Sequence, residues 1–342
     1  MTATPRVVFR ADAGPDIGLG HARRCLTLAG ALRELGVESL FVFAGEGRAR
    51  EWLQASDFEV LPVEPARDLA GTLAHCRARQ VPVIVVDTPA REAGYLTGLT
   101  GAGLRVVVID DLADHELPVD LVVNPSAGAG RLRYRGAART RFLLGASYAL
   151  LRPAFSQAGA RGIPARARRV LVTVGGGDPD DLTSRLVGWA AQALGAVEQD
   201  VVVGPFTTRS RALRVAVDAA PGRVAIHEDP KDVASLMLSA DVALCGGGQT
   251  TYELAATGTP AVAIRLADNQ TLNLTALAEA GTLVWVGDAG DADLGARIGR
   301  ALADLAADAE RRARMSGQGQ TLVDGRGAGR VAREIAALGV AA

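Results

Sequence analysis

The stretch VALCGGGQTTYELAATG, from Val242 to Gly258, contains the unit from which the fold can be predicted. Val242–Cys245 is a short apolar run with the length of a buried strand, and three glycines separate it from a segment of helical composition. A strand without polar alternation is buried on both faces, which is typical of a parallel sheet covered by helices. The stretch therefore predicts one strand–loop–helix unit of an α/β protein.

Similar apolar runs recur along the whole chain, and helical patterns separate them. They are Val7–Arg10, Leu40–Phe43, Val83–Val86, Val106–Ile109, Leu121–Val123, Val170–Val174, Val201–Val203, Val224–Ile226, Val242–Cys245, Ala261–Ile264 and Leu283–Val286. The alternation predicts an α/β protein with two doubly wound, Rossmann-like parallel sheets in two domains that face each other across a cleft.

A stretch without periodicity divides the two sets of strands. Gly159–Arg168 is rich in glycine, proline and arginine, so it is the expected linker. We expect an N-terminal domain at 1–160 and a C-terminal domain at 161–342, with a last helix that could cross back to the first domain. The first helix should follow Gly20, bury a face from Cys25 to Leu35, and end at Gly36.

The composition limits the classes of protein to consider. The chain has 342 residues, a net charge of -1 and 49% hydrophobic residues, which argues against nucleic acid or an anionic membrane as the main partner. Cys25, Cys76 and Cys245 lack metal-type spacing and form an odd set, so reduced thiols, no metal and a cytoplasmic location are expected. We expect a monomer or a weak dimer.

Two glycine loops follow strands of the second half, where ligands of doubly wound domains bind. Glycines let a backbone approach a ligand closely, and a helix N-terminus favours phosphate. We expect UDP there, with uracil near Ile226 and ribose on Glu253. Asp178 as a helix cap and Glu253 in a capping box are the structural alternatives. The predicted UDP contacts are Gly176, Gly177, Ile226, Gly247, Gly248, Gln249, Thr250 and Glu253.

A third loop follows the strand Ala261–Ile264. Asp268, Asn269 and Gln270 offer polar side chains suited to sugar hydroxyls or an acetamido group, although Asp268 could equally be a helix cap. These three residues, together with Gly20, are the predicted sugar-binding residues.

His21 is the candidate catalytic base. It follows Gly18-Leu19-Gly20 at a predicted helix start, where the positive end of the helix dipole favours the neutral imidazole. Asp12 could orient this imidazole or contact the sugar. The loop lacks the third glycine and the acid of a dinucleotide fingerprint, so no NAD and no other cofactor is expected. A purely structural histidine is the alternative.

Several segments together resemble the UDP-sugar hydrolases of pseudaminic acid biosynthesis and the related spore-coat polysaccharide proteins. They are Arg10-Ala11-Asp12, Ile17–Leu26, Ile109–Leu112, Leu144–Pro153, Gly175–Pro179 and Leu266–Gln270, in the same order and spacing. The resemblance implies a GT-B fold and UDP-2,4-diacetamido-2,4,6-trideoxy-β-L-altropyranose as substrate. It also implies that His21 activates water and that Asn269 stands at the family asparagine.

The chain departs from this family at two points. The family usually has Asp-His-Tyr after the third N-terminal strand, whereas this chain has Asp87-Thr88-Pro89. An Arg-Pro-Glu of the family has become Arg152-Pro153-Ala154. The first change concerns the acceptor side, so it bears on which sugar is bound and on whether water is the acceptor.

The resulting hypothesis is the hydrolysis of a UDP-linked sugar with inversion, releasing UDP and free sugar for nonulosonic acid biosynthesis. Backbone N–H groups would stabilise the leaving diphosphate, so a metal is not required. The alternatives are a GT-B glycosyltransferase that moves the sugar from UDP to a small acceptor, and a sugar-nucleotide sensor without enzymatic activity.

Overall fold

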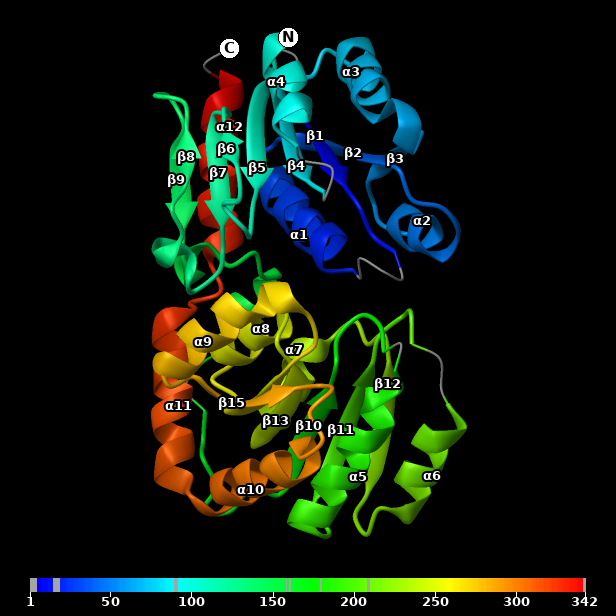
Figure 1. Ribbon diagram of the computed structural model, residues 1–342, viewed down its shortest axis with the longest axis vertical. Coiled ribbons are helices and arrows are strands. Elements are labelled where there is room, and N and C mark those ends of the chain that lie inside the picture. The colour runs from blue at the N-terminus through cyan, green and yellow to red at the C-terminus, as the bar shows by residue number, and fades with distance from the viewer. Residues whose placement is uncertain are drawn as a thin grey trace. The chain divides into compact units, whose positions relative to one another are not determined.

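The computed structural model describes residues 5–14, 19–88, 92–157, 159, 161–178, 180–207 and 210–340 (Figure 1). The chain divides into two compact units. Unit 1 comprises Met1–Arg152 with Arg326–Ala342, and unit 2 comprises Pro153–Gly325. The division precedes the expected boundary at 160, and the expected linker lies within unit 2. There, Arg161 donates to Thr259 Oγ1 at 2.7 Å and to the Ala240 carbonyl, which fixes this segment to the unit.

Unit 1 is built on a seven-stranded parallel sheet in the order β3-β2-β1-β4-β5-β7-β9. Its strands are β1 (Arg6–Ala11), β2 (Glu38–Phe43), β3 (Glu59–Pro62), β4 (Val83–Asp87), β5 (Arg105–Ile109), β7 (Leu121–Asn124) and β9 (Arg141–Leu144), and β6 (Glu116–Leu117) pairs with β8 (Arg135–Gly136). Its helices are α1 (Gly20–Glu34), α2 (Gly47–Gln54), α3 (Asp68–Ala78), α4 (Ala93–Gly101) and α12 (Gly327–Val340).

The sheet of unit 1 is buried by helices on both faces, as apolar strands require. Val8, Ile84 and Val106 form one cluster with Leu96 and Leu99 of α4. Residues one position along each strand point to the opposite face. There, α1 and α12 pack against each other and against the sheet. The closing helix α12 thus belongs to unit 1, although unit 2 separates it from the rest of this unit in the sequence.

The first helix differs from its prediction at its last turn. Cys25, Leu28 and Leu32 are fully buried as expected, but Leu35 is 45% exposed. The helix ends at Glu34, and Gly36 adopts a positive φ of 75° that turns the chain away. Leu35 therefore lies beyond the buried stripe.

Unit 2 is built on a six-stranded parallel sheet in the order β12-β11-β10-β13-β14-β15. Its strands are β10 (Arg169–Thr173), β11 (Glu198–Val203), β12 (Val224–Glu228), β13 (Val242–Gly246), β14 (Ala261–Arg265) and β15 (Leu283–Asp288). Its helices are α5 (Leu182–Leu194), α6 (Arg211–Ala219), α7 (Val233–Ser239), α8 (Thr250–Ala256), α9 (Thr271–Glu279), α10 (Leu294–Ala307) and α11 (Ala309–Leu322).

The core of unit 2 follows the same logic. Val172 and Leu244 share a cluster with Leu186 of α5 and with Ile298 and Leu302 of α10. Helices α8 and α9 contact β13, β14 and β15. In the part of the chain that the structure describes, no helix has the length and apolarity needed to cross a membrane.

The strands that the sequence did not predict are short or peripheral. β3 lies at one edge of its sheet, is only half-buried and contains Pro62, while β9 lies at the other edge. β6 and β8 have two residues each. Edge strands carry weaker apolar patterns because one side faces solvent.

Candidate functional site

Both sheets have a point where the strand order reverses. In each sheet the first strand lies between the second and the fourth, so that β1 borders β4 in unit 1 and β10 borders β13 in unit 2. The helices that follow the two central strands leave such a sheet on opposite sides, so a crevice opens at the carboxyl ends of these strands. We define the charged edge as Asp12, His21, Arg24, Asp87 and Asp111, and the glycine loop as Gly246–Gln249.

His21 meets a buried carboxylate at the charged edge. The parallel register of β1 and β4 pairs Ala11 with Asp87, so Asp87 ends its strand beside the loop that leads to α1. His21 Nδ1 lies 2.6 Å from Asp87 Oδ1, and the Asp87 side chain is 1% exposed. A carboxylate can only accept, so Nδ1 carries the proton and Nε2 is left as the basic nitrogen.

Arg24, one turn further along α1, contacts the same carboxylate. Its Nε and Nη2 atoms lie 2.6 Å from the two oxygens of Asp87, and its Nη1 lies 2.9 Å from Asp111. Burial alone would raise the pKa of Asp87, but the positive charge of Arg24 and the hydrogen bonds from Arg24 and His21 outweigh it and hold that pKa well below its ordinary value. Asp87 is therefore ionised at neutral pH.

Asp12 does not orient the imidazole, which corrects one of the two roles considered for it. Its carboxylate accepts from Arg10 Nη1 at 2.5 Å and from the Thr88 hydroxyl. Arg10 is 2% exposed and also pairs with Asp68, so Asp12 belongs to a second, supporting network. Asp87 holds the histidine instead, because it ends the strand that is adjacent to β1.

The glycine loop of unit 2 is closely surrounded. A Cβ atom added to Gly247 would lie 2.7 Å from Leu274 Cδ1 and 2.9 Å from Gln270 Oε1, so a side chain there would displace its neighbours. Gly248 and Gln249 lead directly into α8. The first amides of a helix lack intrahelical partners, so the loop offers backbone donors without side-chain bulk.

A buried amide fixes the shape of this loop. Asn273 of α9 donates to the Gly247 carbonyl at 3.2 Å and to Thr251 Oγ1 at 3.1 Å, and it accepts from the Tyr252 hydroxyl. Thr251 in turn donates to the Gly248 carbonyl at 2.8 Å. Asn273 is 8% exposed, so it is part of the scaffold rather than a sugar ligand.

The other glycine loop, after β10, has a structural explanation. Asp178 accepts from the amides of Leu182 at 2.7 Å and Thr183 at 2.9 Å, so a carboxylate already occupies the start of α5. The cap alternative for Asp178 is thus what the structure shows, and the contacts of Gly176 and Gly177 with UDP stay a prediction. The loop passes close to Gly204, because a Cβ added to Gly204 would lie 2.5 Å from the Gly176 carbonyl oxygen.

The third predicted loop contributes one residue to the glycine loop. Gln270 Oε1 accepts from the Leu266 amide at 2.9 Å, and its Nε2 lies 3.8 Å from the Cβ position of Gly248. Asp268 points away, with a side chain that is 99% exposed, and Asn269 is also exposed. The structure therefore brings Gln270 to the predicted site but leaves Asp268 and Asn269 in solvent.

Glu253 and Ile226 lie at different distances from the glycine loop. Glu253 is half-buried in the first turn of α8, one turn after Thr250. Ile226 lies on the edge strand β12 and packs against the unit 2 core. Two strands separate β12 from β13, a span of about 14 Å at the usual strand spacing, so uracil at Ile226 would require an extended nucleotide.

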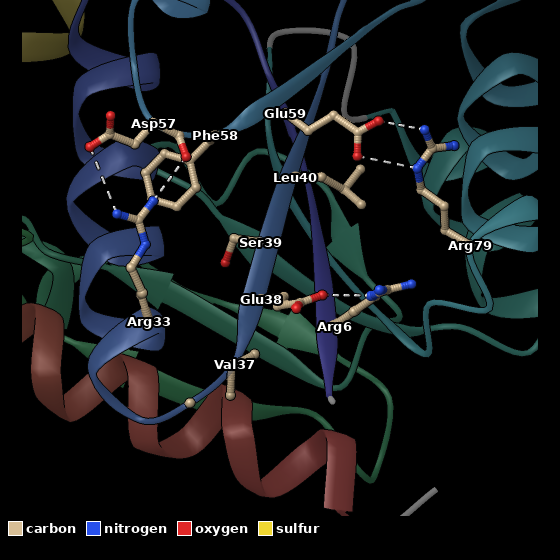
Figure 2. Close-up of a pocket in the computed structure, with 11 residues that line it drawn as sticks. Arg6, Arg33, Val37, Glu38, Ser39, Leu40, Asp57, Phe58, Glu59 and Arg79 are labelled. Atoms are coloured by element: carbon tan, nitrogen blue, oxygen red, sulfur yellow. Dashed lines mark hydrogen bonds and ion pairs between the residues drawn. The ribbon is translucent and has the colours of Figure 1, made fainter. Parts of the chain in front are cut away.

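A hollow of about 660 Å³ lies at the amino-terminal ends of β1, β2 and β3 in unit 1, whereas the charged edge lies at the carboxyl ends (Figure 2). It is lined by the first residues of β1, β2 and β3, which are Arg6, Glu38 and Glu59. Arg6 pairs with Glu38 at 2.8 Å, and Arg79 pairs with Glu59 at 2.5 Å. Its charges are thus paired with one another, at the end of the strands remote from His21.

Sequence reasoning missed three members of the charged edge: Arg24, Asp87 and Asp111. Each was within a quoted motif, but none was given a role. The signal was present, because Asp87 is the last residue of β4 and Asp111 lies two residues after β5, its neighbour in the sheet. Within the described ranges, no group of three or more His, Cys, Asp or Glu residues is arranged to hold a metal ion. The motif residues Ile17 and Gly18, together with Pro89 and Pro179, lie outside those ranges.

Known proteins resemble this chain both in sequence and in fold. No family model matches the chain. The spore coat polysaccharide biosynthesis protein SpsG of Bacillus subtilis (strain 168) is 24% identical over 282 residues, or 81% of this chain and 82% of that protein. The UDP-N-acetylglucosamine--N-acetylmuramyl-(pentapeptide) pyrophosphoryl-undecaprenol N-acetylglucosamine transferase of Salinibacter ruber is 39% identical over 105 residues, or 29% of this chain and 28% of that enzyme.

The fold is shared along the whole chain with a solved structure. The crystal structure of MurG from Acinetobacter baumannii superposes with a TM-score of 0.71 at 13% identity, covering 98% of this chain and 100% of that one. The chain therefore has the GT-B fold, with two Rossmann-like α/β domains. This confirms the fold class expected from the sequence.

Proposed function

We propose that the chain is a GT-B enzyme that hydrolyses a UDP-linked sugar at its anomeric carbon and releases UDP. The contact between His21 and Asp87 is the observation that carries the proposal, since it leaves a basic nitrogen on a ring that is a quarter exposed. The resemblance to spore-coat and pseudaminic acid proteins suggests a diacetamido-trideoxy sugar, and the similarity to SpsG, which is named for spore coat polysaccharide biosynthesis, supports a role in polysaccharide biosynthesis.

UDP would bind to unit 2 with its diphosphate against the glycine loop. Backbone amides at Gly247, Gly248, Gln249 and Thr250 would donate to phosphate oxygens. Gln270 would add a side-chain amide, and Glu253 would accept the ribose hydroxyls. Donors aimed at the leaving phosphate stabilise the charge that develops there. The similarity to an enzyme named for UDP-N-acetylglucosamine supports this choice of nucleotide.

The chemical step would be a single displacement. The oxygen of a water molecule attacks the anomeric carbon while the bond from that carbon to the β-phosphate oxygen breaks. The electron pair leaves with UDP, and the water proton passes to His21 Nε2. The configuration at the anomeric carbon inverts. Asp87 holds the proton on Nδ1 throughout, so Nε2 remains the accepting atom.

A glycosyltransferase is the second candidate, and the fold favours it. The GT-B likeness to MurG covers the whole chain, and the 105-residue similarity is to a named transferase. In that reaction His21 would take the proton from a hydroxyl or amine of an acceptor rather than from water. Asp12 contacts with the sugar remain a prediction under either reaction.

Incubation with a panel of UDP-sugars separates the two reactions. We expect UDP to appear without any added acceptor, at a rate proportional to enzyme, and proton NMR of the freshly released sugar to show the inverted anomer. The His21→Ala variant provides the background rate. Strict dependence of UDP release on an added alcohol or amine would reject hydrolysis in favour of transfer, and an intact UDP-sugar under all conditions would reject both.

A further inference from the structure

His21 has a second charged neighbour besides the carboxylate that orients it. Arg24 Nη2 lies 3.2 Å from His21 Nδ1, and the same atom lies 2.6 Å from Asp87 Oδ1. Both nitrogens are donors once Nδ1 is protonated, so this contact is an approach of two like dipoles, not a hydrogen bond. The shorter contact, from Nδ1 to Asp87, decides the tautomer.

The guanidinium also covers the carboxylate. Arg24 engages both oxygens of Asp87 in a two-point pair, which is the strongest geometry available to an arginine. An imidazolium at His21 would therefore face a carboxylate whose charge is already neutralised. It would also face a cation at 3.2 Å.

The remaining charges near His21 can be assigned to their elements. α1 contributes Arg24 and the Cys25 thiol, which lies 3.5 Å from Asp87 Oδ2. Burial, together with the Asp87 charge, holds the pKa of that thiol well above its ordinary value, so it stays neutral. The segment after β5 contributes Asp111, which pairs with Arg24. The end of β1 contributes Asp12, whose charge is paired with Arg10.

We propose that Arg24 is a positioning residue that keeps the catalytic histidine unprotonated, by neutralising Asp87 and by placing a cation beside the ring. The inference rests on the proposed role of His21 as a base. Arg24 touches neither water nor sugar in this scheme and acts only through Asp87 and His21. Asp111 weakens this effect of Arg24, because its carboxylate compensates part of the positive charge of the guanidinium.

The Arg24→Gln variant tests this directly. Removing the cation leaves His21 beside an uncovered carboxylate, so the midpoint of the ring's NMR titration should move to higher pH. Asp111→Asn should move the titration midpoint in the opposite direction and by less, because it removes a negative charge that offsets part of the positive field of Arg24. Asp111 is partly exposed, so this variant keeps the test available if Arg24→Gln does not fold.

Two readouts separate this inference from the proposed function. The first follows the Cε1–H resonance of His21 with pH by NMR, assigned by its absence in His21→Ala, and needs no activity. The second is the acid limb of kcat/KM for UDP release. Arg23→Gln is the matched control, since it removes the neighbouring charge of α1, whose guanidinium lies over Trp52 at 5.8 Å from the ring centroid. This control should leave both curves in place.

The outcomes are distinct. Opposite shifts of the NMR curve in Arg24→Gln and Asp111→Asn, with none in Arg23→Gln, support the inference even if no UDP-sugar is turned over. Unshifted curves in both variants overturn it even if hydrolysis is observed. Equal shifts in Arg23→Gln also overturn it, because they would reflect only the net charge of the helix.

Discussion

The two units carry very different side chains at the equivalent position of their two sheets. Strand order reverses between β1 and β4 and again between β10 and β13. At the first point the chain supplies carboxylates and guanidinium groups that pair with one another. At the second it supplies three successive glycines held by the buried amide of Asn273.

The difference indicates a division of labour. At the first point the carboxylates outnumber the guanidinium groups: they are Asp12, Asp87 and Asp111 against Arg10 and Arg24. Arg10 also pairs with a further carboxylate, Asp68. The excess negative charge there would repel a diphosphate, whereas it would not repel a neutral sugar or water. At the glycine loop the three glycines carry no side chains of their own, and no charged residue stands among Gly246–Gln249. Unit 1 is therefore suited to proton transfer, and unit 2 to holding an anion.

The largest effect should come from His21→Ala. Loss of the general base should lower turnover about 10²–10⁴-fold. UDP affinity should be nearly unchanged, because the proposed nucleotide site lies in the other unit. Turnover measured by UDP release and binding measured by calorimetry provide the two values. A variant with normal turnover would remove the imidazole from the mechanism.

Asp87→Asn should lower turnover about 10²-fold. The new amide can donate to Nδ1, which moves the ring proton to Nε2 and leaves no atom to accept from water. Asp12→Asn is the matched control, because it makes the same chemical change on a carboxylate that does not touch the ring. A greater loss of kcat in Asp12→Asn than in Asp87→Asn would reverse the assignment.

Gly247→Val should weaken UDP binding about tenfold, since displacing packed neighbours costs about 1–3 kcal/mol. The added carbons would press on Leu274 and Gln270, so the loop would change shape. Gly317→Ala is the control. It lies in α11, an added Cβ there meets nothing within 4 Å, and it should leave binding intact. Unaltered affinity in Gly247→Val would place the diphosphate elsewhere.

Acid should destabilise unit 1 first, with the smallest of these effects. Burial tends to raise the pKa of Asp68 and of Asp87, but arginines outweigh it and both pKa values are lowered. The stability that these two carboxylates add is fully present above the unfolded pKa of about 3.9. It is lost as pH falls from there through the folded pKa of each group, at up to about 1.4 kcal/mol per pH unit for each carboxylate. Hydrogen exchange at pH 6 and pH 3 should show protection lost in unit 1 before unit 2.

The Asp68→Asn variant sharpens that comparison. It removes one of the two carboxylates, so the pH dependence of its unfolding free energy should be flatter below pH 4 than that of the parent protein. Denaturant unfolding at several pH values measures the slope. Earlier loss of protection in unit 2 would contradict the assignment of acid sensitivity to Asp68 and Asp87 of unit 1.

The sequence predicted most of the fold because buried parallel strands are continuous apolar runs. The runs around Val83 and Val242 needed no tertiary information to be recognised. The edge strands β3 and β9 lacked that signal. The end of α1 was predicted one residue too far, because periodicity alone cannot show that Leu35 extends past the core.

The site could be predicted only where backbone type decides the chemistry. The position of the glycine loop after β13 could be predicted from sequence, because its three glycines separate a buried strand from a helix, and its role as the diphosphate site stays a prediction. The partner of His21 could not, since Asp87 becomes its neighbour only through the pairing of β1 with β4 across the sequence. The loop after β10 was ambiguous in the sequence, and the structure shows the cap that was one of the alternatives for Asp178. A cap and a phosphate site begin with the same residues.

A crystal structure of the protein with bound UDP tests the central claim most directly. We predict phosphate oxygens at hydrogen-bond distance from the backbone amides of Gly247–Thr250, with Glu253 at the ribose and with His21 still on Asp87. A diphosphate bound instead among Asp12, Asp87 and Asp111, or anywhere else than the glycine loop, would contradict the division of labour between the two units.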